Sequence, residues 1–387
     1  MAARCERPSG ASESLSRLHW GGLAQGPEEK RGFDGRTSGV VLTIAGILAD
    51  KRLSLGRGVP PPHLRPLMRF HNGEIAVKAP PNVASGPSRV TIGNIAPCSP
   101  PLLLTAPGTP LDPHLAENLR SAWGGTALDW LAPGEAVEFG IPMVPDNRWQ
   151  VWADLQASRV DMVIQRSKGR RKKMLLADMD STMIQQECID ELAAEAGVGP
   201  RVAEITKRAM NGELDFEGAL IERVGLLRDL DEAVIARVLA ERITHMPGGR
   251  ELIATMKADG GHAALVSGGF TAFTEKVAEA LGFHEHRANT LLAAGGRLTG
   301  DVARPILGRE AKVQALHEIT ERLGIMPDDV IAVGDGANDL GMLGLAGTGV
   351  ALHAKPVVAE QCEVRVNHGD LTALLYIQGY RKEMFSI

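Results

Sequence analysis

The sequence predicts an α/β protein, in which a parallel sheet with helices on both faces follows a small α+β domain and a low-order segment. Three observations support this prediction. Short apolar runs alternate with helical patterns from residue 174 onward, polar loops follow three of these runs, and the composition changes near residue 101. A length of 387 residues suits two or three domains. We expect boundaries that divide the chain into residues 1–100, 101–170 and 171–387.

Residues 1–100 differ in composition from the rest of the chain. The first 101 residues hold 12 of the 23 prolines, and residues 1–100 hold 13 Lys and Arg against 7 Asp and Glu. The remaining residues hold 29 against 40. The segment shows no sustained helical or strand period, so it would bury little apolar surface against its ordering entropy. We interpret it as a disordered tail, or as the result of a translation start placed too far upstream. We prefer this interpretation to a basic recognition arm or an organelle-targeting segment.

Residues 101–165 show the pattern of a small α+β unit. The apolar periods predict strands and helices in the order Leu102–Leu104, Leu111–Trp123 (helix), Ala127–Leu131, Asn147–Ala157 (helix) and Val160–Ile164. The unit ends at the basic run Arg166–Lys173, which carries six charges in eight positions. Such a run suits a phosphate or nucleic-acid patch, but it is more often a solvated linker, and we interpret it as a linker.

The remaining chain alternates strands with helices. The expected strands are Met174–Ala177, Ala263–Val266, Val330–Val333, Val350–Leu352 and Val364–Val366. Helical spacing occurs from Ile189 to about residue 243, at Phe273–Leu281 and at Ala311–Leu323, and Gly295-Gly296 marks a hairpin. This alternation implies a parallel sheet, whose ligands sit beyond the carboxyl ends of the strands.

The overall composition excludes several classes of protein. The net charge of −5 gives no reason to expect nucleic-acid or membrane-surface binding. The apolar run Val40–Ala49 is too short to span a membrane, and it lacks the flanks of a secretory signal. Four cysteines lie far apart without a CxxC pair, so neither a zinc site nor a disulfide framework is expected. We therefore predict a cytoplasmic protein.

Carboxylates gather in two of the polar loops. Asp178 and Asp180 leave the first strand of the sheet two residues apart, where both side chains can point to one side of the loop. Taken alone, the pair is equally explained by turn-forming residues. The later loop Gly334–Asp339 adds Asp335 and Asp339 at another strand end. Converging carboxylates suit Mg²⁺, which keeps several waters and is usually shared with a phosphate.

Phosphate-holding groups occur in the same order along the chain. Ser267–Gly269 follows a strand and is expected to open a helix, where a hydroxyl and amide hydrogens can face an anion. Lys312 sits near the start of a predicted helix, where the positive end of the helix dipole disfavours a cation. A bound phosphate would compensate for this repulsion. A plain helix cap and a solvated lysine explain each feature separately. Their common position at strand ends and helix starts favours a phosphate site.

These motifs resemble the four ordered motifs of the haloacid dehalogenase superfamily. The resemblance rests on Asp178–Thr182, Ser267–Phe270, Lys312 and Gly334–Asp339, and it covers roughly residues 174–380. The Asp-x-Asp-Ser-Thr form, with Glu187 and a helix from Phe216 to Arg223, is similar to phosphoserine phosphatases in particular. That family implies a helical cap at about residues 187–245, and the unit at 101–165 is placed like an ACT-like regulatory domain.

The resemblance also implies a mechanism and its residues. Asp178 would attack phosphorus and form an aspartyl-phosphate, and Asp180 would act as general acid and base. Asp178, the main-chain carbonyl of Asp180 and Asp335 would hold Mg²⁺. The groups expected to bind the phosphoryl oxygens or support the site are Ser267, Gly268, Lys312, Asn338 and Asp339.

Substrate choice is expected to depend on the cap. The resemblance implies that Glu187 pairs with the ammonium and Arg223 with the carboxylate of O-phospho-L-serine, although the residues alone would favour a helix-surface ion pair. Met210 and Phe216 could line the apolar side, and core packing alone also explains them. The implied reaction is the last step of serine biosynthesis. The alternatives are a related phosphatase or phosphotransferase acting on phosphohomoserine or another small phosphate, and an idle amino-acid sensor. The intact acidic and lysine set argues against the sensor, and a homodimer stays open.

Overall fold

The computed structural model describes residues 68–71, 74–77, 100–210 and 213–387. In the unit formed by residues 1–89, β1 (Met68–His71) pairs antiparallel with β2 (Glu74–Val77). Apart from this strand pair, the prediction of a low-order segment at residues 1–100 lies outside the described residues. Residues 90–387 form the second unit, which holds all the predicted site residues.

The second unit begins with a four-stranded antiparallel sheet. Its elements are β3 (Pro101–Leu104), α2 (Pro113–Ala122), β4 (Asp129–Ala132), β5 (Ala136–Glu138), α3 (Arg148–Ala157) and β6 (Asp161–Ile164). The strand order β4-β5-β3-β6 gives the ferredoxin-like βαββαβ arrangement. Leu103 and Val137 lie on the face that α2 and α3 cover. The predicted α+β unit is confirmed, and we call it the small domain.

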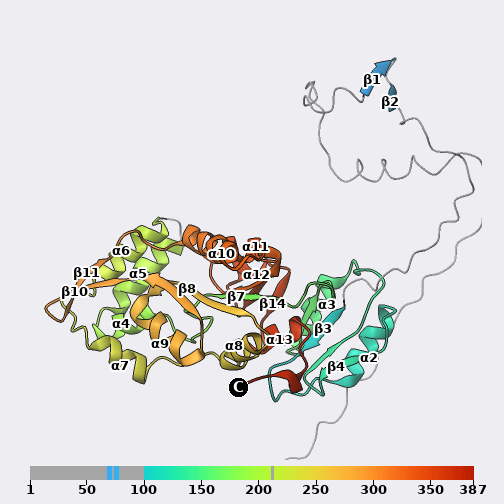
Figure 1. Ribbon diagram of the computed structural model, residues 1–387, viewed down its shortest axis with the longest axis horizontal. Coiled ribbons are helices and arrows are strands. Elements are labelled where there is room, and N and C mark those ends of the chain that lie inside the picture. The colour runs from blue at the N-terminus through green and yellow to red at the C-terminus, as the bar shows by residue number, and fades with distance from the viewer. Residues whose placement is uncertain (1–67, 72–73, 78–99, 211–212) are drawn as a thin grey trace, which may run out of the picture. The chain divides into compact units, whose positions relative to one another are not determined.

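A six-stranded parallel sheet forms the centre of the larger part (Figure 1). Its strands are β7 (Met174–Ala177), β8 (His262–Phe270), β9 (Glu285–Asn289), β12 (Val330–Gly334), β13 (Thr348–Leu352) and β14 (Val364–Val366). The strand order is β14-β13-β12-β7-β8-β9, and every neighbouring pair is parallel. The predicted α/β fold class is therefore confirmed.

Both faces of this sheet are buried, which explains why its strands are continuously apolar. Met174 and Leu176 face one layer, while Leu175 and Ala177 face the other. The first layer consists of α10 (Arg309–Leu323), α11 (Leu340–Leu345) and α12 (Pro356–Ala359). The second consists of α8 (Gly249–Ala258), α9 (Thr271–Leu281) and α13 (Ala373–Ile377).

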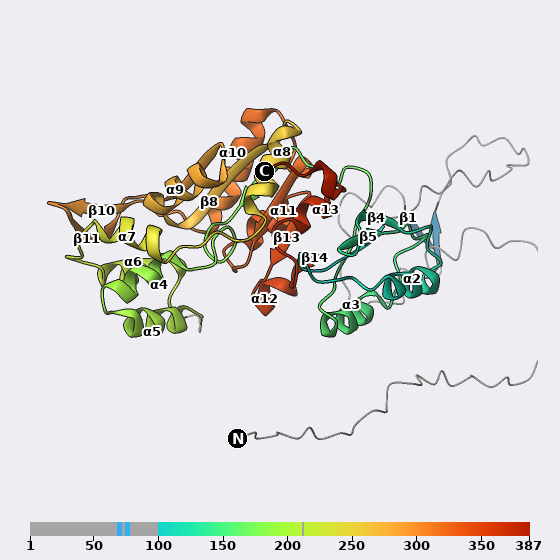
Figure 2. The ribbon, with the colours of Figure 1, turned by 90° about the horizontal axis from the view of Figure 1, so that it is seen from below.

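Four helices between β7 and α8 form the cap (Figure 2). They are α4 (Cys188–Glu195), α5 (Gly199–Met210), α6 (Phe216–Gly225) and α7 (Val234–Glu241). The hairpin of β10 (Leu291–Ala294) and β11 (Arg297–Val302) joins the cap through backbone bonds such as Asp229 N–H to Leu298 O, at 2.9 Å. No helix in the described part of the chain has the length and apolar character needed to cross a bilayer.

The small domain packs on the C-terminal helix of the larger part. Leu104, on the sheet face opposite α2 and α3, belongs to the same buried cluster as Leu374 of α13. The carboxylate of Asp161 is fully buried and accepts backbone N–H groups from residues 367, 368 and 369, at 2.8–2.9 Å. The Tyr376 hydroxyl donates to Glu135 at 2.7 Å. The two domains therefore share one core.

Candidate active site

The predicted polar loops meet at the carboxyl edge of the central sheet. Strands β12, β7 and β8 are neighbours, so Asp335, Asp178 and Ser267 come from adjacent strands. Asp178 follows β7 directly, and its N–H donates to Val333 O at 3.0 Å. Ser267 lies inside β8, which continues to Phe270 past an irregularity in its pairing. The helix expected to open at Ser267 therefore begins only at Thr271.

Lys312 joins two carboxylates in the interior. Its ammonium donates to Asp178 Oδ1 at 2.5 Å and to Asp339 Oδ1 at 2.6 Å, and the lysine is 1% exposed. Burial alone would lower the pKa of Lys312, but the carboxylates of Asp178 and Asp339 raise it above its ordinary value. Lys312 is therefore a fixed positive charge beside Asp178.

Three acidic side chains could hold a metal ion together. Ligand atoms of Asp178, Asp335 and Asp339 lie within 4.8 Å of one another, and all three residues are buried. Burial raises the pKa of Asp178 and of Asp335, and the charge of Asp339 raises both further. Lys312 supplies one positive charge to this group of three carboxyl groups. Buried, converging carboxylates of this kind fit a divalent cation.

Asp180 is held by different partners from those of Asp178. Its Oδ1 accepts the backbone N–H of Cys188 at 2.8 Å, and its Oδ2 accepts the Ser267 hydroxyl at 3.1 Å. The side chain of Asp180 is therefore outside the group of three carboxylates, while the expected metal ligand at this position is its main-chain carbonyl. The Ser267 hydroxyl also accepts the N–H of Gly269 at 2.8 Å, which fixes its position.

The cap brings Glu187 and Arg223 toward Asp180. The Ser181 hydroxyl donates to Glu187 Oε1 at 2.9 Å. Burial, followed by the charge of Asp180, raises the pKa of Glu187 to about 7. Burial lowers the pKa of Arg223, while the carboxylates of Asp190, Glu187 and Asp180 oppose that shift. In the described part of the chain Arg223 forms no direct ion pair, and its Nε donates to Ala219 O within its own helix.

Phe216 lies between the cap and the central sheet. A Cβ atom built on Gly268 would be 3.0 Å from the Phe216 ring, and one built on Gly308 would be 3.2 Å from it. The same Cβ on Gly268 would be 3.7 Å from the amide nitrogen of Asn338. Gly268, Phe216 and Asn338 are thus close together. Met210 ends α5, but its side chain lies outside the described residues.

Two further residues at strand ends belong to the site. Lys355, three residues after β13, places its ammonium 3.5 Å from Asp335 Oδ2. Asn289, the last residue of β9, donates to Gly268 O at 2.9 Å and to Leu307 O at 3.2 Å. The sequence analysis named neither residue. The strand-end rule that found Asp178 would also have found Lys355, because a predicted strand precedes it.

Residues 175–344 match the family model of haloacid dehalogenase-like hydrolases, and this region includes Asp178, Lys312, Asp335 and Asp339. The chain is 42% identical over 206 residues to the phosphoserine phosphatase of Methanocaldococcus jannaschii, which is 53% of this chain and 97% of that protein. The chain belongs to the phosphoserine phosphatase family. The family suggested by the sequence motifs is therefore confirmed.

Other members of the phosphoserine phosphatase family match over similar regions. The enzyme of Streptomyces coelicolor is 43% identical over 256 residues, which is 65% of this chain and 62% of that protein. The chain therefore spans less than two thirds of the length of this relative. A solved structure of a phospho-aspartyl intermediate analogue of phosphoserine phosphatase is 42% identical and covers 53% of this chain and 98% of that one, with a TM-score of 0.50.

Proposed function

We propose that this protein hydrolyses O-phospho-L-serine to L-serine and phosphate through an aspartyl-phosphate, as the last step of serine biosynthesis. One observation carries the proposal: two buried aspartates two residues apart have separate partners suited to separate roles. Asp178 is bound to the fixed cation of Lys312, whereas Asp180 is bound to the Ser267 hydroxyl and the Cys188 N–H. The first arrangement suits a nucleophile beside a phosphoryl group, and the second suits a proton donor.

The reaction proceeds in two displacements. A carboxylate oxygen of Asp178 attacks phosphorus, the bond to the serine oxygen breaks, and Asp180 protonates that oxygen. Asp180 then accepts a proton from a water molecule that attacks the phosphorus of the aspartyl-phosphate, which releases phosphate and restores Asp178. Lys312, Ser267 and the backbone N–H of Gly268 stabilise the phosphoryl oxygens, and Asn338 supports the same side.

The metal that we propose for the carboxylate group is Mg²⁺. Asp178, Asp335 and the main-chain carbonyl of Asp180 would hold it, and Asp339 would support the group from its bond to Lys312. When bound, Mg²⁺ neutralises negative charge on the phosphoryl oxygens. The raised pKa values of Asp178 and Asp335 suit this ion, since a cation favours the ionised form of both carboxyl groups.

The cap would recognise the amino-acid part of the substrate. Glu187 binds the ammonium, and Arg223 binds the carboxylate through two parallel N–H groups. Phe216 covers the apolar side of the enclosed space. The proposed partner is thus a small molecule. We also propose a cytoplasmic location, with which the free thiols of Cys188 and Cys362 in the described part are consistent.

Phosphate release from a panel of substrates tests the proposed function. The panel contains O-phospho-L-serine, phosphohomoserine, phosphoglycolate and glucose 6-phosphate, each with and without Mg²⁺. We expect phosphoserine to be preferred, because phosphoglycolate lacks the ammonium and glucose 6-phosphate lacks the carboxylate. A preference for phosphohomoserine would instead support the alternative that the protein is a related phosphatase with a different substrate. Metal-independent release would contradict the role of the carboxylate group.

Arg223→Ala is expected to change specificity. We predict a loss of about 100-fold in kcat/KM for phosphoserine, because one charged bidentate contact supplies a few kcal/mol. Hydrolysis of 4-nitrophenyl phosphate, which has no carboxylate, should change less than about threefold. Arg237→Ala, on the cap surface and paired with Glu195, is the matched control. Equal losses on both substrates would show that Arg223 acts structurally.

The pH dependence of substrate recognition should report on Glu187. Its pKa of about 7 means that the carboxyl group is ionised, and able to pair with an ammonium, only above that pH. The ratio of kcat/KM for phosphoserine to that for 4-nitrophenyl phosphate should therefore fall about tenfold per pH unit below pH 7. Glu187→Gln should remove this dependence. A ratio that stays flat from pH 5.5 to pH 8 in the unmodified protein would contradict the raised pKa of Glu187.

A further inference from the structure

The basic run Arg166–Lys173 has no part in the proposed function. The structure gives its last four residues local partners. The Arg170 guanidinium binds Glu138 at 2.5 Å, and Arg171 lies 3.7 Å from the centre of the Tyr380 ring. Lys173 pairs with Asp329 at 3.3 Å. Arg166 and Lys168, in contrast, form no hydrogen bond or ion pair within the described residues.

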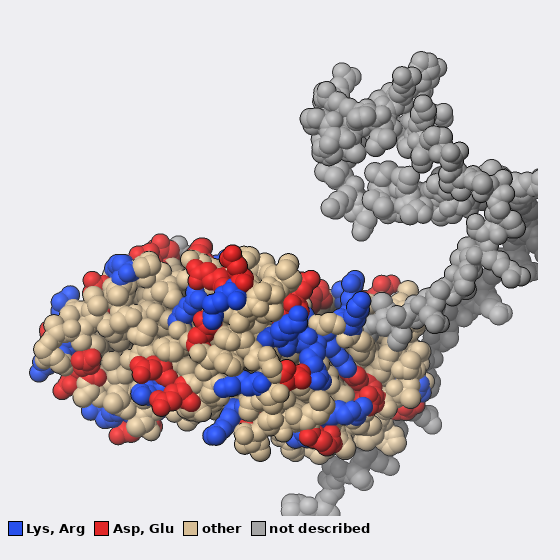
Figure 3. All heavy atoms as spheres, in the orientation of Figure 1, with Lys and Arg blue, Asp and Glu red and all other residues tan. Residues whose placement is uncertain are grey.

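These two cations lie at the edge of a large cavity. The cavity has a volume of about 800 Å³ and lies between the linker and the amino ends of β13 and β14. It is separate from the Asp178 site, which occupies the carboxyl edge of the same sheet. Figure 3 shows a group of Lys and Arg side chains on the surface over β14 and α3. Strand β14, which lies under this basic group, also borders the cavity.

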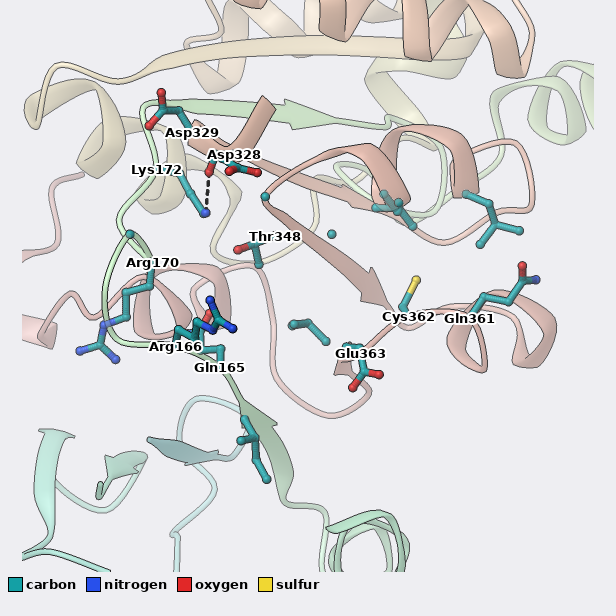
Figure 4. A pocket seen from close by; sticks show the side chains of 18 of the residues that line it. Gln165, Arg166, Arg170, Lys172, Asp328, Asp329, Thr348, Gln361, Cys362 and Glu363 are labelled. Carbon is teal, nitrogen blue, oxygen red and sulfur yellow. Dashed lines mark hydrogen bonds between the residues drawn. The ribbon is translucent and has the colours of Figure 1, made fainter. Parts of the chain in front are cut away.

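Two residues on the cavity wall are mostly buried and have polar groups available to a ligand. Lys172 is 9% exposed, and its ammonium donates one hydrogen bond, to Asp328 O at 2.7 Å. Its ammonium has two further N–H groups. Thr348 is 8% exposed, and its hydroxyl has no partner among the described residues. In Figure 4 the Thr348 hydroxyl and the Lys172 ammonium point toward each other, and Arg166 points into the same space.

The charge balance of the lining indicates the kind of ligand. The cations without an acidic partner within 4 Å are Arg166, Lys168, Lys172 and Arg309, whereas the unpaired carboxylates are those of Asp328 and Glu363. The excess is two positive charges. Glu363 points away from the Thr348 hydroxyl in Figure 4. Burial lowers the pKa of Lys172, while the charges of Asp328 and Asp329 oppose that shift, and an anion beside the ammonium would oppose it further.

We propose that this cavity binds a phosphate dianion, either inorganic phosphate or the phosphoryl group of a small phosphomonoester. Arg166 and Lys172 supply charged donors, and the Thr348 hydroxyl supplies a neutral one. Arg166 belongs to the linker and Thr348 to β13, so the anion joins the linker to the catalytic part. This site does not depend on the proposed phosphatase activity.

Equilibrium dialysis with radiolabelled inorganic phosphate, in the presence of Mg²⁺ and on the full chain, tests the site. The unmodified protein should bind two phosphates, one at the active site and one in the cavity. Arg166→Gln combined with Thr348→Val should bind one, with kcat/KM for 4-nitrophenyl phosphate unchanged within about twofold. Lys312→Met should keep the cavity phosphate and lose the other. Lys276→Gln, which changes the charge on the far α9 surface, should bind two.

The number of phosphates bound by each variant decides whether the cavity is a phosphate site. Equal stoichiometry in the double variant and the unmodified protein would overturn the proposal, as would a single phosphate that Lys312→Met removes. Glycerol 3-phosphate, dialysed against Lys312→Met, distinguishes the two sources of the phosphoryl group. Tighter binding than inorganic phosphate identifies a phosphomonoester as the occupant, and weaker binding identifies phosphate itself.

Discussion

Asp178→Asn is expected to abolish turnover, with kcat for phosphoserine falling at least about 10⁴-fold. An amide is no nucleophile toward phosphorus, while the substitution keeps the size and shape of the side chain. No covalent phosphoenzyme should form. Acid quenching of a reaction with ³²P-labelled phosphoserine measures this directly, since an aspartyl-phosphate is retained on the protein after precipitation.

The control for this experiment is Asp301→Asn. It makes the same chemical change on the exposed surface of β11, where Asp301 pairs with Arg304 at 3.4 Å. Its kcat and its phosphoenzyme signal should match those of the unmodified protein. If Asp178→Asn retained substantial activity, water would attack phosphorus directly, and the two-step mechanism would be wrong.

Lys312→Met should be the most destabilising single change at the site. It leaves the buried carboxylates of Asp178 and Asp339 without the cation that now lies 2.5 and 2.6 Å from them. Removing one partner of a buried ion pair costs about 3–5 kcal/mol. For a unit of this size that corresponds to a fall in thermal midpoint of roughly 10 °C in EDTA.

The physical reason can be tested by a second substitution. Asp339→Asn added to Lys312→Met removes one of the two unpaired carboxylates, so the thermal midpoint should recover by at least about 3 °C. Scanning fluorimetry in EDTA measures both changes. Lys276→Met on the surface, which breaks only an exposed pair with Glu279, should shift the midpoint by about 1 °C or less. An unchanged midpoint in Lys312→Met would mean that the two carboxyl groups protonate instead.

Two of the strands that the sequence analysis found are central strands of the sheet and are buried on both faces. Met174–Ala177 and Val330–Val333 are continuously apolar because helices cover them on each side. The analysis missed β9, whose residues Glu285–Asn289 are mostly polar. This strand lies at the edge of the sheet, where Glu285 pairs with His262 at 2.6 Å. Its place in the sheet depends on pairing with β8, and no local apolar pattern records that pairing.

The residues at the strand ends of the candidate site could be predicted from the sequence, whereas the contacts that the cap makes could not. The position of a residue after a strand indicated Asp178 and Asp335, because parallel strands present their ends on one edge. The bond from the Ser181 hydroxyl to Glu187 depends on the turn between β7 and α4, including a positive φ of 54° at Ser181. Periodicity carries no information on such a turn. The contact of Phe216 with Gly268 likewise depends on how the cap closes.

The packing of α13 on the small domain has a consequence for synthesis on the ribosome. The apolar sheet face with Leu102, Leu104 and Val163 is made early in translation, whereas α13 (Ala373–Ile377), which helps to cover it, is made near the end. At about 5–20 residues per second, this face waits roughly 10–40 s for its partner. During that interval the nascent chain carries an uncovered β-sheet surface. Slower translation would lengthen this exposure. Because an exposed apolar sheet face can aggregate, a chaperone that covers it should raise the yield of folded protein.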